Sequence, residues 1–152
     1  MTSASGCWEL ELWDVVRAAP EQIYALMTAP ADLARWWGPR GFTIPEVELD
    51  PRVGGRYRVT MQPPQGDAFH VTGVFREWEP PHRLAYTFRY EEPSPDDQET
   101  VVVLTFPQVD AGTEVVLSQG PFATEERLLL HRTGWTESLE KLRALVDRPL
   151  AV

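Results

Sequence analysis

The chain has 152 residues, of which 14 are basic and 23 acidic, giving a formal net charge of −9 at neutral pH. This length predicts one domain over residues 1–152, with a core that needs no metal or disulfide. No basic cluster is present to replace the counterions of phosphates, and no apolar run approaches the ~18 residues of a membrane helix. Composition therefore argues against nucleic acid and membranes as partners.

The N-terminal segment favours a cytoplasmic protein. Residues 1–6 lack the basic and apolar regions of a signal peptide. Cys7 is the only cysteine, so no intrachain disulfide can form. Beside Trp8, we interpret it as a small apolar side chain rather than a nucleophile.

The elements follow from periodicity and from proline and glycine. Loose alternation over residues 8–18 predicts a first strand, and Pro20 and Pro30 each suit the first position of a short helix. Gly38 and Pro39 end the second helix. A period of two then predicts an antiparallel run of six strands, around residues 47–49, 57–61, 69–78, 84–90, 100–106 and 114–119.

The last element is a long helix. Apolar residues at helical spacing predict it over residues 124–146, about 34 Å at 1.5 Å per residue, with Thr124 as its cap. Such a helix can cross the whole sheet. The order of elements indicates an α+β domain with a core over about residues 10–146.

Several motifs in this order carry a resemblance to a known family. They are Ala18–Tyr24, Leu33–Pro39, Gly54–Tyr57, Pro80–Leu84 and Gly134–Trp135. Together they resemble the START/Bet v 1-like (SRPBCC) superfamily, in its AHSA1 branch of Hsp90-ATPase-activator homologues. The resemblance implies a helix-grip fold, in which a curved antiparallel sheet of about six to seven strands wraps the C-terminal helix around a cavity.

The resemblance also implies a function. Proteins of this type bind hydrophobic small molecules, and some relatives catalyse cyclisation or aromatisation in the cavity. The branch is named after a domain of an Hsp90 co-chaperone that carries a further N-terminal domain. This sequence has no room for that domain, so we do not expect an Hsp90-type chaperone as its partner.

The candidate ligand-binding residues are those that the period of two places on the concave face of the sheet, with Trp37 and two residues of the last helix. Most would be large apolar side chains of the core under any hypothesis. The set is Trp37, Tyr57, Val59, Phe75, Glu77, Tyr86, Phe88, Leu104, Leu117, Gln119, His131 and Trp135.

The polar members of this set leave alternatives open. The hydroxyls of Tyr57 and Tyr86 could hydrogen-bond a ligand or a backbone group. His131 lies one turn before Trp135, so its ring could face the sheet or lie in solvent at the helix flank. Glu77 shares a face with Phe75 and could act as an acid or base, or lie at the rim. Gln119, where relatives often have histidine, cannot transfer protons near neutral pH.

No motif predicts a metal, catalytic triad or phosphate site, and we expect no cofactor. Our hypothesis is a protein that binds a hydrophobic small molecule between the sheet and the last helix. One alternative is an enzyme of the cyclase, dehydratase or hydrolase kind that uses Glu77, His131 and the tyrosines. The other is a chaperone-associated or dimeric interaction module, which leaves a homodimer open.

Overall fold

The computed structural model describes residues 8–147. Cys7 lies outside this range. The elements, in chain order, are β1 (Trp8–Val16), α1 (Pro20–Thr28), α2 (Pro30–Trp36), β2 (Thr43–Leu49), β3 (Arg56–Gln62), β4 (Phe69–Glu79), β5 (Arg83–Tyr90), β6 (Thr100–Thr105), β7 (Gln108–Val109), β8 (Gly112–Phe122) and α3 (Glu125–Asp147).

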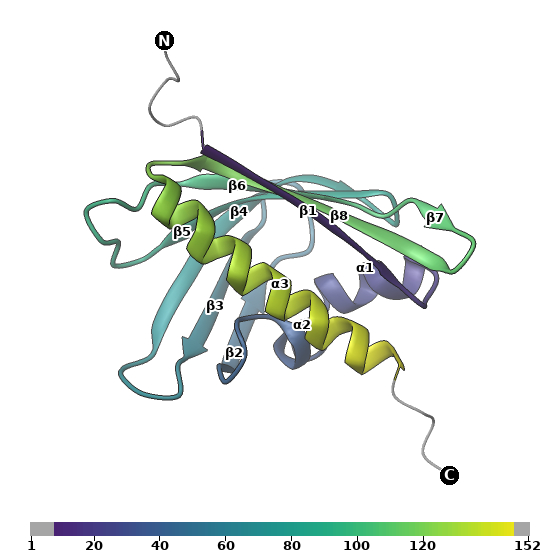
Figure 1. Cartoon of the computed structure of the whole chain (residues 1–152), viewed down its shortest axis with the longest axis horizontal. Helices are drawn as coiled ribbons and strands as arrows, with labels where there is room; N and C mark the ends of the chain where they lie inside the picture. Colours follow the sequence, from purple (N-terminus) through teal and green to yellow (C-terminus); the bar gives the residue numbers. More distant parts are fainter. Residues whose placement is uncertain (1–7, 148–152) are drawn as a thin grey trace.

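The strands form one antiparallel sheet that α3 crosses. Its order is β1-β8-β6-β5-β4-β3-β2, with the short β7 paired to β8 off this path. Figure 1 shows α3 running diagonally across the sheet. α2 packs against α3, and α1 packs against α2. The predicted helix-grip arrangement is confirmed.

The helices begin and end where the sequence predicts. Pro20 opens α1, and the backbone N–H of Ala19 donates to Oε1 of Gln22 at 3.0 Å. The backbone N–H of Arg127 donates to Oγ1 of Thr124 at 3.1 Å, so Thr124 caps α3. Gly38 follows α2 with a φ of 96°, which a residue with a side chain rarely adopts.

Two predictions about the strands are wrong. β8 continues past Gln119 to Phe122, so Gln119 does not end its strand. In β4, the register with β5 shifts between Phe75 and Glu77, which breaks the alternation. Glu77 therefore does not share the inner face with Phe75: it is partly exposed, and Nε of Arg83 donates to its Oε1 at 2.8 Å.

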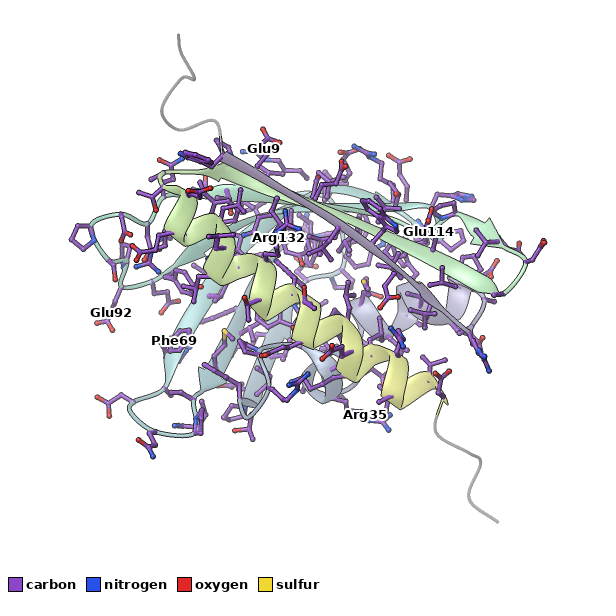
Figure 2. All side chains as sticks on the ribbon, in the orientation of Figure 1. Glu9, Arg35, Phe69, Glu92, Glu114 and Arg132 are labelled. Carbon is purple, nitrogen blue, oxygen red and sulfur yellow. The ribbon has the colours of Figure 1, made fainter. Side chains whose placement is uncertain are left out.

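The core lies between the sheet and the helices. Side chains from all the long strands fill this space (Figure 2). Trp78, beyond the shift in β4, rejoins the inner face and packs its ring 4.9 Å from that of Phe75. Leu104 and Leu117 are at most 1% exposed and lie in the sealed part of this core. Within residues 8–147, no helix is both long enough and apolar enough to span a bilayer.

Candidate functional site

A pocket of about 160 Å³ lies between α3, the segment that follows α2 and the inner face of β3, β4 and β5. Its deep part is buried, whereas Leu130 on α3 is about half exposed, so the pocket opens beside this helix. Phe69, labelled in Figure 2, lines the pocket from the start of β4. The lining residues are Trp37, Gly38, Pro39, Phe42, Met61, Phe69, Phe88, Tyr90, Leu130, His131, Gly134, Trp135 and Ser138.

Aromatic rings form most of the wall. In the deep part, the ring of Trp37 lies 6.2 Å from that of Phe88 and 6.0 Å from that of Trp135. Toward the opening, Phe69 lies 6.1 Å from Phe42 and 5.8 Å from the ring of Tyr90. Most of these pairs are edge-to-face, the geometry that the ring quadrupoles favour.

The segment that follows α2 is hydrogen-bonded to α3. The backbone N–H of Gly38 donates to Oγ of Ser138 at 3.0 Å, and that of Arg40 donates to Oε1 of Glu137 at 2.9 Å. Nζ of Lys141 donates to the carbonyl of Trp37 at 3.3 Å. These bonds hold one wall of the pocket against the helix that forms the other.

Tyr90 and His131 supply the titratable pair of the pocket. The Tyr90 hydroxyl and Nε2 of His131 are 3.4 Å apart. The imidazole is buried, with the ring of Phe88 5.4 Å away and that of Phe122 4.8 Å away. Burial lowers the pKa of His131 to about 4 and raises the pKa of Tyr90 to about 12, so both are neutral at pH 7.

Arg127 lies one turn before His131 on α3. Its Nη2 is 3.0 Å from Oδ1 of Asp96, and its Nε is 3.3 Å from Oδ1 of Asp97. The two carboxylates compensate the guanidinium charge. These three charged side chains lie outside the lining of the pocket. Together with Tyr90 and His131 they line a separate cavity of about 10 Å³ at the β5–β6 loop.

Trp37 separates the pocket from a second, smaller cavity. This cavity, of about 20 Å³, is lined by Met27, Leu33, Trp37, Leu49, Tyr57, Val59, Phe75 and Tyr86. The Tyr57 hydroxyl donates to the carbonyl of Thr87 at 2.6 Å, and burial raises the pKa of Tyr57 well above its usual value. Burial also raises the pKa of Tyr86, an effect that the neighbouring Trp37 indole opposes.

The comparisons with known proteins identify the family of the chain. Residues 17–147 match the family model of Activator of Hsp90 ATPase homolog 1-like protein. The chain belongs to the AHSA1-like family. This confirms the resemblance carried by the sequence motifs. No curated protein matches the chain.

Solved structures of similar proteins share this AHSA1-like fold. A Chromobacterium violaceum protein is 28% identical with a TM-score of 0.85, over 93% of this chain and 98% of its own. A Rhodobacter sphaeroides protein is 29% identical with a TM-score of 0.81, over 97% of each chain. The AHSA1 protein of Silicibacter pomeroyi is 29% identical with a TM-score of 0.79, over 90% of this chain and 96% of its own.

The predicted site residues of this AHSA1-like chain fall into distinct groups. Those in the larger pocket are Trp37, Phe88, His131 and Trp135. Those in the smaller cavity are Tyr57, Val59, Phe75 and Tyr86, with Trp37 shared. Leu104, Leu117 and Gln119 lie in the core behind both cavities, and Glu77 lies outside them.

Sequence reasoning missed part of the lining, notably Phe42, Phe69, Tyr90, Leu130 and Gly134. Two signals could have found some of them. Tyr90 follows Phe88 at the strand period of two, and Leu130 lies one helical turn before Gly134. Phe42 carried no such signal, because it lies in the loop between α2 and β2, where side chains have no regular period. Among residues 8–147, no group of three His, Cys, Asp or Glu side chains is arranged to hold a metal ion.

Proposed function

We propose that the protein binds a hydrophobic small molecule in the pocket between α3 and the sheet. The observation that carries this proposal is an apolar, largely aromatic pocket of about 160 Å³ with an opening beside Leu130. An engineered apolar cavity of roughly 150 Å³ stays dry and binds benzene, so a space of this size suffices for one aromatic ring. A second ring would extend into the opening beside Leu130. Family membership supports the same function.

The enzymatic alternative has weaker support. It relied on Glu77, His131 and the tyrosines as donors and acceptors. Of these, only His131 lines the pocket, and Tyr57 and Tyr86 line the smaller cavity. Glu77 is paired with Arg83 on a partly exposed segment. Gln119, the residue in place of a histidine, has both ends of its amide engaged, by Trp135 and Thr100.

Naphthalene, titrated into ¹⁵N-labelled protein and followed by amide chemical shifts, tests the proposal. We expect saturable shifts at the amides of Gly38 and Gly134, which line the pocket. Gly134→Met places a long apolar side chain in the opening and should weaken binding at least about tenfold. Thr133→Met adds the same side chain on the exposed face of α3 and serves as the control.

Two results would reject the proposal: no saturation in folded wild-type protein, or unchanged affinity in Gly134→Met. Native mass spectrometry of gently purified protein complements the titration. A mass excess that disappears on denaturation would reveal a resident ligand and allow its identification.

A further inference from the structure

The shape of the pocket favours flat ligands. Trp37 and Trp135 meet at a 75° angle in its deep part, and Phe88 lies beside Trp37. Ring faces and edges therefore line the space on several sides. Another aromatic ring can meet these walls edge-to-face or offset-stacked, which adds favourable contacts beyond the burial of its apolar area.

Most polar atoms of the lining already have partners. The hydroxyl of Ser138 donates to the carbonyl of Gly134 at 2.9 Å and accepts from the N–H of Gly38. The indole N–H of Trp135 donates to Gln119 at 2.7 Å. The contact between Tyr90 and His131 is different, because at 3.4 Å it is longer than the roughly 2.7–3.2 Å of a well-formed bond. The Tyr90 oxygen can donate and accept, so it has capacity for a ligand group.

The pocket offers no counter-charge to an ionised ligand. None of its lining residues within 8–147 is Asp, Glu, Lys or Arg. Its histidine is neutral at pH 7, because burial lowers the pKa of His131 to about 4. Arg127, one turn before that histidine on α3, is paired with Asp96 and Asp97. A carboxylate or ammonium entering this space would lose its hydration without compensation.

We infer that the pocket selects an uncharged aromatic compound of one or two rings whose single hydroxyl group bonds to Tyr90 beside His131. This inference rests on the proposed function and specifies its ligand. The rings would occupy the space between Trp37, Phe88 and Trp135. The hydroxyl would sit at the end of the pocket where β5 meets the first half of α3.

Three probes with the same ring system separate the contributions of the rings, the hydroxyl group and a negative charge to binding. They are naphthalene, 2-naphthol and 2-naphthoate, titrated at pH 7 with protein amide shifts as the readout. We expect 2-naphthol to bind about fivefold more tightly than naphthalene, the gain of one added hydrogen bond. We expect 2-naphthoate to bind at least about tenfold more weakly than naphthalene, because its charge has no partner.

Tyr90→Phe is the diagnostic variant. It removes the hydroxyl and keeps the ring that packs against Phe69 and Phe88. It should abolish the preference for 2-naphthol over naphthalene when both are titrated into the same variant. Tyr24→Phe is the matched control, since its hydroxyl donates to the carbonyl of Arg83 at 3.1 Å, away from the pocket.

The outcomes distinguish this inference from the proposed function. If naphthalene binds and 2-naphthol shows no advantage, or if 2-naphthoate binds as tightly, the inference is wrong and the proposed function stands. If Tyr90→Phe keeps the preference, the hydroxyl is recognised elsewhere and the assignment to Tyr90 is overturned. If none of the three probes saturates, both proposals fail.

Discussion

The indole N–H of Trp135 donates a hydrogen bond to Oε1 of Gln119 at 2.7 Å, at a point where both side chains are withdrawn from water. The same amide donates from Nε2 to Oγ1 of Thr100 at 2.9 Å. One side chain on β8 thus joins α3 to β6. The ring of Trp135, a wall of the pocket, takes its position from this bond.

Replacement of Gln119 by leucine should be strongly destabilising. It leaves the Trp135 N–H without its acceptor and Thr100 without its donor, and a buried polar group that loses its partner costs roughly 1–3 kcal/mol. We expect Gln119→Leu to lower the free energy of unfolding by about 3 kcal/mol, measured by urea denaturation. Gln65→Leu, the same change on the exposed β3–β4 turn, should stay within about 0.5 kcal/mol of wild type. Equal losses in both variants would contradict the structural role of Gln119.

Burial of His131 predicts a loss of stability in mild acid. Its pKa falls from 6.5 to about 4 on folding, so below pH 6.5 the unfolded chain binds a proton that the folded chain does not. The contribution of His131 to the free energy of unfolding is constant well above pH 6.5 and declines as the pH falls from 6.5 toward 4. Between pH 6.5 and about 4.5 the loss from this residue should reach about 2 kcal/mol.

Three neighbouring groups act on the protonation of His131. Asp97 favours the charged imidazole, whereas desolvation and Arg127 oppose it, and Tyr90 lies against its Nε2. In urea denaturation across this pH range, His131→Phe should show a flatter decline than wild type. His82→Phe, a change in the exposed β4–β5 turn, should keep the wild-type decline. Parallel curves for wild type and His131→Phe would refute the prediction.

The fold could be predicted because its signals are local. Pro20 and Pro30 mark helix starts, Gly38 marks a helix end, and the alternation over Leu84–Tyr90 marks a strand with a buried face. These signals act within a few residues of one another. They can therefore be recognised without knowing which elements pack together in the folded chain.

The site was less predictable because it depends on strand register and on packing between residues that are far apart in the sequence. The register shift after Phe75 moves Glu77 off the inner face, and the alternation along β4 carries no sign of it. Phe42 and Phe69 pack together although the strands β2 and β3 separate them in the sequence. The division of the interior into two cavities depends on the volume and direction of one side chain, Trp37. Composition and periodicity do not encode such details.

We predict that replacement of Gly134 by alanine stabilises the protein. A Cβ there would meet Cγ of Pro39 at 3.6 Å, an ordinary van der Waals contact. Alanine in place of glycine inside a helix typically adds 0.5–1 kcal/mol of stability. Gly134→Ala should therefore raise the free energy of unfolding by about 0.5–1 kcal/mol and weaken naphthalene binding a few-fold. Lower stability in urea denaturation would mean that the added methyl is not tolerated against Pro39.

Adjacent Trp36 and Trp37 provide a matched pair that tests the division of the interior. Both are almost fully buried. The indole N–H of Trp36 donates to the carbonyl of Leu26 at 2.9 Å, and Trp36 lines neither cavity, whereas Trp37 lines both. Either Trp→Leu variant should lose about 3 kcal/mol of stability, near the lower end of losses for large-to-small core changes at tryptophan.

The two variants should differ in what they bind. Trp37→Leu removes the partition and joins the cavities of about 160 and 20 Å³. Biphenyl, a longer apolar probe, then has room for its second ring, and its affinity should rise about fivefold over wild type because more apolar area is buried. Trp36→Leu should give no such gain. Trp36 lines neither cavity, so the space that its ring leaves does not open into them. A similar gain in both variants, measured by calorimetric titration, would show that Trp37 does not limit ligand length.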